Sequence, residues 1–220
     1  MQKSDNWKIG EVISSPVTHH TKINLSDLTQ PEKYHLLIST VIPRPIAWVS
    51  TKSEKGIGNL APYSFFNAVS SNPPCIMFSV SNSRAGKKHT LKNIEQTKEF
   101  VINLVPTFLL GPMSCTASMY PDGVDELKEI GLTPISSTMI APVRVKESPI
   151  NLECKLYDIK NIGGEGAGGA NIVFGEVLVA HIWDEAIENG KIISEKLSPL
   201  GRLGGADYFE PGNKVSYVVP

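Results

Sequence analysis

The sequence has few cysteines, no long apolar run and almost no net charge. Its three cysteines, Cys75, Cys115 and Cys154, are widely spaced without a CxxC pair, so neither a disulfide framework nor a zinc site is predicted. No apolar run of about 18 residues occurs and the N-terminus lacks a signal-peptide core, so no membrane span or export is expected. We therefore expect a cytoplasmic protein with reduced thiols.

The charge balance argues against nucleic acid and membrane surfaces as partners. The formal net charge is −1, and the 21 Lys and Arg residues are scattered along the chain rather than clustered. The 220 residues are 41% hydrophobic and 20% charged, which is ordinary for a soluble globular domain. The composition thus favours small-molecule chemistry or protein contacts.

The stretch 41–81 has the clearest pattern in the chain. Strands are predicted at Pro45–Thr51, Ser64–Val69 and Cys75–Val80, because β-branched and aromatic residues there are bounded by Pro, Gly, Asn and Ser. These would form an antiparallel meander. Between the first two strands, Asn59–Ser64 places small and hydroxyl residues around a proline beside bulky aromatic rings. Such a place suits a flat aromatic ligand with a polar edge.

The rest of the chain adds short helices and further strands. A capping box at Thr29–Glu32 predicts a helix before the meander, Thr90 is the expected N-cap of a helix over Leu91–Thr97, and residues 107–130 read as mainly helical. Further strands are predicted at 99–105, 143–146, 150–162 and 172–182. We predict a mainly β, antiparallel small barrel with helical additions at 26–220, preceded by an N-terminal arm at 1–25 that could wrap a neighbour.

The segment Gly164–Gly169 matches the dinucleotide-binding pattern G-x-G-x-x-G. That pattern binds a pyrophosphate only when a helix begins at the loop. Here a strand pattern follows the loop. We interpret the segment as a flexible hairpin loop.

Five segments together resemble one known family. They are Arg44–Thr51 (RPIAWVST), Asn59–Asn67 (NLAPYSFFN), Ser71–Pro74 (SNPP), Lys88–Thr90 (KHT) with Asn93, and Pro199–Gly205 (PLGRLGG). In this order they resemble the flavin reductase-like family, the FMN-binding split barrels that include flavoredoxin, over about residues 26–208. The resemblance implies a split β-barrel, bound FMN, and a homodimer with the flavin at or near the subunit interface.

The resemblance also implies a set of cofactor contacts. Lys88 and Thr90, with Arg84, Lys87 and Ser64, have the cationic and hydroxyl groups that a phosphate requires. Strand backbone and apolar side chains would cover the flavin ring. The predicted cofactor-binding residues are Trp48, Val49, Ser50, Thr51, Asn59, Ala61, Pro62, Tyr63, Ser64, Ser79, Val80, Ser81, Lys88 and Thr90.

Several residues keep two interpretations at this point. Trp48 is either a core residue of its strand or a stacking partner of the flavin. His89 replaces the Asp of the Lys-Asp-Thr found in many members, and is either a solvated loop residue or a group near the phosphate. His181 is either structural or a proton donor, and Arg202 and Tyr208 are either interface residues or anchors of the C-terminal tail.

The predicted reaction is hydride transfer from NADH or NADPH to FMN, followed by electron transfer to an acceptor. In this chemistry the cofactor reacts and the protein orients it, so no catalytic acid, base, nucleophile or metal ligand is named. Two alternatives are kept. One is a flavoredoxin-like electron carrier reduced by a protein partner, and the other is a barrel without cofactor that serves as an interaction module.

Overall fold

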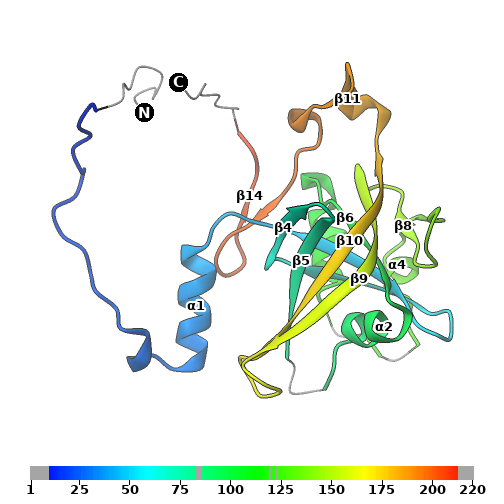
Figure 1. The fold of residues 1–220 in the computed structure, drawn as a ribbon, viewed down its shortest axis with the longest axis horizontal. Helices are drawn as coiled ribbons and strands as arrows, with labels where there is room; N and C mark the ends of the chain where they lie inside the picture. The colour runs from blue at the N-terminus through cyan, green and yellow to red at the C-terminus, as the bar shows by residue number, and fades with distance from the viewer. Residues whose placement is uncertain (1–9, 83–85, 119, 122, 213–220) are drawn as a thin grey trace.

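A seven-stranded antiparallel sheet forms the body of the protein (Figure 1). The computed structural model describes residues 10–82, 86–118, 120–121 and 123–212. The strand order is β3-β2-β6-β9-β10-β5-β4. The strands are β2 (Ala47–Lys52), β3 (Gly58–Tyr63), β4 (Phe66–Ser71), β5 (Pro74–Ser81), β6 (Glu99–Asn103), β9 (Ile150–Ile162) and β10 (Ala170–Ile182).

The sheet curls on itself without closing through hydrogen bonds. Its edges are β3 and β4. Nevertheless the Tyr63 ring on β3 contacts the Phe78 ring on β5, with centroids 5.2 Å apart, although these strands stand near opposite ends of the strand order. Side chains rather than backbone therefore bridge the gap. The predicted mainly β, antiparallel split barrel is confirmed.

Short helices and two-residue strands surround this sheet. The helices are α1 (Gln30–Thr40), α2 (His89–Thr97), α3 (Leu110–Cys115) and α4 (Glu126–Glu129), with 3-10 turns η1 (Leu25–Asp27), η2 (Thr107–Leu109), η3 (Asp184–Ala186) and η4 (Ser194–Lys196). The short strands are β1 (Arg44–Pro45), β7 (Pro134–Ile135), β8 (Arg144–Val145), β11 (Ile187–Glu188), β12 (Lys191–Ile192), β13 (Gly201–Arg202) and β14 (Tyr208–Phe209). None of the helices in the described part of the chain has the length and hydropathy that a bilayer-spanning helix needs.

Strand β2 is buried on both faces because it separates two apolar clusters. Side chains alternate between the faces of a strand, so Ala47 and Val49 face the barrel interior while Trp48 faces the opposite cluster. The interior cluster includes Phe78 and Phe100 and is covered by α2, whereas α3 and α4 cover the second cluster. The second cluster places α3 and α4 against the outer face of β2 and β3, where the candidate site lies.

The N-terminal segment extends away from the sheet (Figure 1). Residues 10–24 form no helix or strand and are exposed along their whole length. Helix α1 follows, with the predicted capping box between Thr29 and Glu32, and buries only Ile38. The predicted division into an arm at 1–25 and a domain at 26–220 stays a prediction.

The meander has one strand more than the sequence indicates. Residues 58–63 form a separate strand, and the predicted strand Ser64–Val69 begins only at Phe66. The sequence pattern is misleading because Pro62 stands inside β3, and a proline is tolerated there since β3 is an edge strand. The predicted strands that became β2, β5 and β6 are confirmed.

Two helix predictions need correction, and one loop prediction is confirmed. Helix α2 begins at His89 with Lys88 as N-cap, so Thr90 lies inside the first turn. Within 107–130 the described residues hold only η2, α3 and α4, because Pro121 and Gly123, whose φ is 91°, interrupt the helical pattern. The glycine-rich segment joins β9 to β10 as a hairpin loop, as expected.

Candidate functional site

A cleft of about 320 Å³ lies between β3, the start of α2 and the segment that leads into α4. Its size is within the range of small-molecule sites. Six of the predicted contact residues line it: Asn59, Ala61, Pro62, Tyr63, Lys88 and Thr90. The sequence did not point to the other wall, which includes Thr116, Ala117, Ser118, Tyr120 and Glu126.

The polar floor of the cleft is a hydrogen-bonded group of buried side chains. Thr90 is 1% exposed, and its Oγ1 lies 2.9 Å from the side-chain amide of Asn59. The nearby Thr90 hydroxyl lowers the pKa of the Tyr63 phenol, but burial has the larger effect. Burial raises the pKa of Tyr63 to about 12, so the phenol stays protonated near neutral pH. The position of Thr90 inside α2 therefore turns its hydroxyl toward the cleft instead of capping the helix.

Lys88 brings a positive charge to this cleft. Its ammonium group lies over the Tyr63 ring, 5.6 Å from the centroid, and desolvation lowers the pKa of Lys88. Among the described residues no carboxylate pairs with Lys88, whereas Lys87 forms an ion pair with Glu95 at 2.7 Å. Lys88 is thus the cation of the cleft that is available to an anionic ligand.

A second, smaller hollow adjoins the cleft at Lys88. It measures about 120 Å³ and is lined by Val80 and Ser81 of β5, among others. Because Lys88 lines both spaces, one extended ligand could contact β3 and β5 together. The hollow thus places two more predicted cofactor-binding residues, Val80 and Ser81, beside the cleft.

Glu126 is the acidic residue of the cleft. Its side chain is 4% exposed, and its Oε2 accepts a hydrogen bond from the Leu60 backbone N–H at 3.0 Å. Burial raises the pKa of Glu126, against the lowering effects of that hydrogen bond and of nearby His89. Sequence reasoning missed Glu126 because it lies in the same short helix as Glu129, with nothing in the pattern to tell them apart.

Four predicted contact residues on β2 do not present their side chains to the cleft. Trp48 and Val49 are fully buried, and Ser50 and Thr51 are 2% exposed. The Ser50 hydroxyl donates to the Val143 carbonyl, and the Thr51 hydroxyl accepts from the Asn93 amide at 3.0 Å. Strand β2 also pairs with β3 and β6 on its two sides. A role for these four residues in cofactor binding stays a prediction.

Ser64 and Ser79 also lie outside the cleft. Ser64 Oγ accepts from the Arg44 side chain at 3.4 Å, and Arg44 in turn donates to carbonyls of Ile38 and Leu203. The Ser79 backbone N–H donates to the Phe65 carbonyl at 2.9 Å, beside the sheet edge. Their contacts with a cofactor stay predictions, and Arg84 lies outside the described residues.

The structure places the residues for which the sequence left two interpretations open. Trp48 is a core residue whose Nε1 donates to Thr116 Oγ1 at 2.8 Å. His89 is half-buried in the first turn of α2 and lines the cleft, so it is not a solvated loop residue. The Arg202 guanidinium stacks on the Tyr208 ring at 4.3 Å, which joins β13 to β14.

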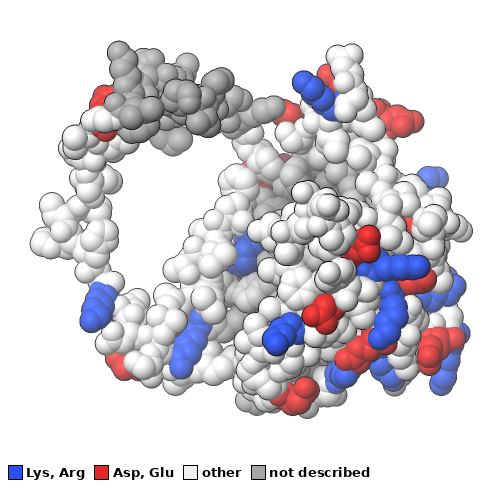
Figure 2. All heavy atoms as spheres, viewed as in Figure 1, with Lys and Arg blue, Asp and Glu red and all other residues white. Residues whose placement is uncertain are grey.

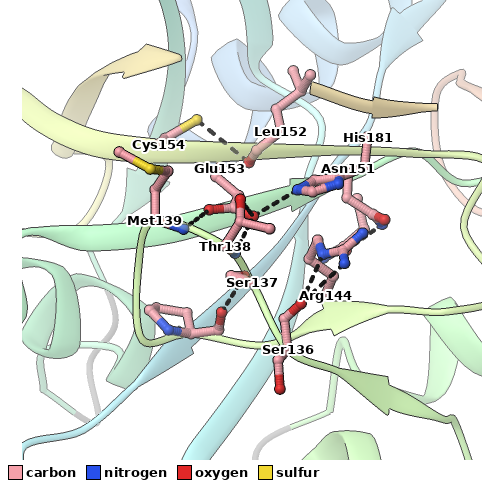
Figure 3. Close-up of polar contacts among 12 residues, drawn as sticks. Ser136, Ser137, Thr138, Met139, Arg144, Asn151, Leu152, Glu153, Cys154 and His181 are labelled. Atoms are coloured by element: carbon pink, nitrogen blue, oxygen red, sulfur yellow. Dashed lines mark hydrogen bonds and ion pairs between the residues drawn. The ribbon is translucent and has the colours of Figure 1, made fainter. Parts of the chain in front are cut away.

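His181 belongs to a second polar cluster, built around Glu153 (Figure 3). The Glu153 carboxylate is fully buried, lies 2.6 Å from His181 Nε2, and accepts from the backbone N–H groups of Thr138 and Met139 at 2.7 Å each. Burial alone would raise the pKa of Glu153, but these bonds together lower it to about 2. None of these residues lines the cleft, so the structural interpretation of His181 fits the geometry.

The charged surface shows no patch of one sign on the face in view. Figure 2 shows Lys and Arg interspersed with Asp and Glu beside α2 and along the β9–β10 hairpin. Among the described residues, no group of three or more His, Cys, Asp or Glu side chains is placed to hold a metal ion. Neither a charged patch nor a metal cluster therefore competes with the cleft as the candidate site among the described residues.

Comparisons with known proteins give consistent results. A family model described as flavin reductase like domain matches residues 39–199. An uncharacterised protein of Aquifex aeolicus is 42% identical over 179 residues, which cover 80% of this chain and 89% of that protein. Nitrilotriacetate monooxygenase component B from Bacillus cereus superposes with a TM-score of 0.87 at 33% identity, covering 91% of this chain and all of that one. The 2-nitrobenzoate 2-nitroreductase NbaA of Pseudomonas fluorescens gives 0.81 at 34% identity, covering 91% and 96%.

Proposed function

Because the chain belongs to the flavin reductase-like family, we propose that it binds FMN in the cleft around Lys88 and Thr90. The observation that carries this proposal is the Lys88 ammonium, which is partly desolvated, lies over an aromatic ring, and has no carboxylate partner among the described residues. A cation in such a place is stabilised by an anionic ligand such as a phosphate. Buried hydroxyl and amide groups beside it supply neutral donors.

The residues of the cleft fit the parts of FMN. Lys88 and Thr90 would hold the phosphate, with the lysine as a point charge and the threonine as a hydrogen-bond donor. Ala61, Pro62 and Tyr63 form an apolar wall that suits the flat ring system. Val80 and Ser81 in the adjoining hollow extend the contact surface to β5.

We propose that the activity is NAD(P)H oxidation with transfer of electrons to an acceptor. FMN, when bound, would supply the hydride acceptor and the one- or two-electron donor. The chain would bind and orient the cofactor and exclude water from the cleft. NADH or NADPH is the proposed co-substrate. A second protein is the proposed acceptor, because one similar solved structure is component B of a nitrilotriacetate monooxygenase.

We also propose a homodimer and a cytoplasmic location. The homodimer is supported by exposed apolar side chains along the N-terminal segment and α1, including Val12, Ile13, Tyr34 and Leu37. One copy of the chain leaves these surfaces in water, and a second copy would cover them. The free state of Cys75, Cys115 and Cys154 fits a reducing compartment.

The test is an anaerobic visible spectrum of the purified protein, before and after a small excess of NADH or NADPH. Flavin absorption that bleaches within the mixing time is the expected result. Flavin absorption that persists would leave an FMN protein reduced by a protein partner. No flavin absorption, even after FMN is added, would contradict the proposed cofactor.

A further inference from the structure

A second cleft, of about 340 Å³, adjoins the first cleft at Asn59 and His89. Both residues line both clefts, so the two spaces share a wall. The other lining residues come from the turn between β2 and β3, from one face of α2 and from the stretch before α4. They are Ser53, Glu54, Lys55, Ile57, Gly58, Lys92, Asn93, Gln96, Gly123 and Val124. The proposed FMN site uses none of these side chains.

Helix α2 turns a polar stripe toward the second cleft. His89, Lys92 and Gln96 are three and four residues apart, so they lie on one face of the helix. Leu91 and Ile94 lie on the opposite face, within the interior apolar cluster. The amphipathic pattern of α2 therefore determines that Lys92 borders this cleft.

The turn between β2 and β3 supplies Lys55 from a backbone of fixed shape. The Ser53 N–H donates to the Ile57 carbonyl and the Gly56 N–H donates to the Ser53 carbonyl, each at 2.9 Å. The Ile57 N–H donates to Ser53 Oγ at 3.1 Å. Gly56 has a φ of 83°, which glycine adopts without strain. Lys55 and Lys92 thus reach the same cleft from two different walls.

The two lysines give the second cleft an excess of positive charge. Among the described residues, no carboxylate forms an ion pair with Lys55 or Lys92, whereas Lys87 is paired with Glu95. Glu54 is the acidic residue of the described lining. Two ammonium groups without carboxylate partners favour an anionic ligand, and a phosphate accepts hydrogen bonds from both.

The proposed reaction requires a place for the adenosine half of the co-substrate. The nicotinamide must reach the flavin, which the proposed function places in the first cleft, and the adenosine is at the other end of the dinucleotide. The second cleft adjoins the first and has the size of a small-molecule site. NADPH differs from NADH by a phosphate on the 2′-oxygen of the adenosine ribose. A basic side chain suits that phosphate, whereas a carboxylate suits the free 2′-hydroxyl of NADH.

We propose that the second cleft binds the adenosine 2′-phosphate of NADPH through Lys55 and Lys92, so that the protein prefers NADPH to NADH. The identity of the ligand as a co-substrate rests on the proposed function. The anion site itself rests on the cleft and on its two lysines. Glu54 stands in the same cleft, and its carboxylate would favour NADH if it dominated the two cations.

The first test measures kcat/KM for NADPH and for NADH in the FMN-loaded protein, with ferricyanide as electron acceptor. The wild type should favour NADPH by about tenfold or more, because a charge-assisted hydrogen bond has that value. Lys55→Ala and Lys92→Ala should each lower kcat/KM for NADPH about tenfold and leave that for NADH within about twofold. Lys92→Arg should keep the preference, because it keeps the charge. Equal use of both dinucleotides by the wild type would overturn the proposal.

Matched variants separate a local contact from the general effect of charge. Lys160→Ala removes the same charge from an exposed position on β9, which lines neither cleft, and should follow the wild type. Glu54→Gln should not weaken the use of either dinucleotide. A wild type that prefers NADH and loses this preference in Glu54→Gln would show a carboxylate bound to the ribose 2′-hydroxyl, and it would overturn the proposal.

Calorimetry tests the anion site independently of redox activity. Adenosine 2′,5′-bisphosphate is titrated into the purified protein, with adenosine 5′-phosphate for comparison. The bisphosphate should bind more tightly, and it should bind about tenfold more weakly to Lys92→Ala. That result in a protein that binds no FMN or oxidises no NADPH would overturn the proposed function and leave the anion site standing.

Two other outcomes would overturn the present proposal alone. One is a protein that binds FMN and oxidises NADPH, but in which the two adenosine phosphates bind equally and independently of Lys55 and Lys92. The other is an affinity for FAD that exceeds the affinity for FMN and falls in Lys92→Ala. That result would assign the second cleft to the adenylate of a flavin.

Discussion

Two buried glutamates in this protein have opposite surroundings. Glu153 accepts hydrogen bonds from two backbone N–H groups, a threonine hydroxyl and a histidine, all from elements packed around it. Glu126 accepts from one backbone N–H, that of Leu60, and from the side-chain amide nitrogen of Asn59 at 3.2 Å. The pKa of Glu153 is therefore lowered to about 2, whereas that of Glu126 is raised.

The difference between the two carboxylates shows what burial alone does not determine. Both side chains are withdrawn from water, and burial raises the pKa of each. The number of hydrogen-bond donors that the fold holds against the carboxylate decides whether its pKa is raised or lowered overall. A carboxylate with all its donors in place stabilises the fold, and one with too few donors sits in a cleft where a proton or a ligand can complete its surroundings.

The largest expected effect is the loss of the Glu153 cluster. Glu153→Ala should lower the free energy of unfolding by about 3–5 kcal/mol, because it leaves buried N–H groups and His181 without their acceptor. Urea denaturation measures the change. Glu147→Ala is the matched control, since Glu147 also accepts from a backbone N–H, that of Thr133, but it is half-buried and its hydrogen bond is exposed to solvent. An effect of Glu153→Ala no larger than that of the control would contradict the structural role.

The second effect is a loss of stability in acid that depends on Glu153. The pKa of Glu153 is about 2 in the folded protein and 4.5 in the unfolded chain. Ionised Glu153 therefore stabilises the fold fully above pH 4.5, and this stabilisation disappears as the pH falls toward 2. This difference corresponds to about 3 kcal/mol. Unfolding free energies measured from pH 6 to pH 2.5 should fall less steeply in Glu153→Gln than in the wild type. Parallel curves would show that another group is responsible.

Glu126 should show the opposite sign in the same experiment. Because its pKa is raised in the folded protein, ionisation destabilises the fold, and stability is lost as the pH rises from the unfolded pKa through the folded one. Glu126→Gln removes that cost. We therefore expect Glu126→Gln to be at least as stable as the wild type at pH 7, in contrast to Glu153→Gln.

The fourth prediction concerns the cation of the cleft. Lys88→Ala should weaken FMN binding by about 1.5–3 kcal/mol, the scale of a hydrogen bond to a charged group, without lowering the free energy of unfolding. Fluorescence titration and urea denaturation give the two numbers. Lys87→Ala is the control, because Lys87 already pairs with Glu95. Unchanged FMN affinity in Lys88→Ala would remove this residue from the site.

Sequence reasoning found one wall of the cleft and missed the other. Asn59, Ala61, Tyr63 and Lys88 belong to segments with a recognisable local pattern, and the structure brings them together. Glu126 comes from a four-residue helix that also contains Glu129, and only tertiary packing buries one and exposes the other. Local pattern indicates which residues could bind a ligand, but it does not show which distant segment completes the site.

Buried contacts were the second kind of feature that the sequence did not reveal. Ser50 and Thr51 carry hydroxyls that suit a phosphate or a ribityl chain, yet in the structure these hydroxyls bond to Val143 and Asn93. Whether a polar side chain serves the core or a ligand depends on which partners the fold brings within hydrogen-bond distance. The small antiparallel β-barrel could be predicted from strand spacing and turn residues, because these are local signals, whereas the split barrel was implied by the resemblance to the flavin reductase-like family.

The smallest effect should come from Trp48, a core residue that is hydrogen-bonded to a residue of the cleft. Its Nε1 donates to Thr116 Oγ1 at 2.8 Å, and Thr116 lines the cleft while Trp48 is fully buried in the core. Trp48→Phe should cost about 1 kcal/mol of stability for the lost hydrogen bond, since Thr116 keeps its bond to the Met113 carbonyl. FMN affinity should stay within twofold of the wild type. A tenfold loss of FMN affinity with an unchanged free energy of unfolding would instead make Trp48 a flavin contact. The flavin site would then include β2 as well as β3.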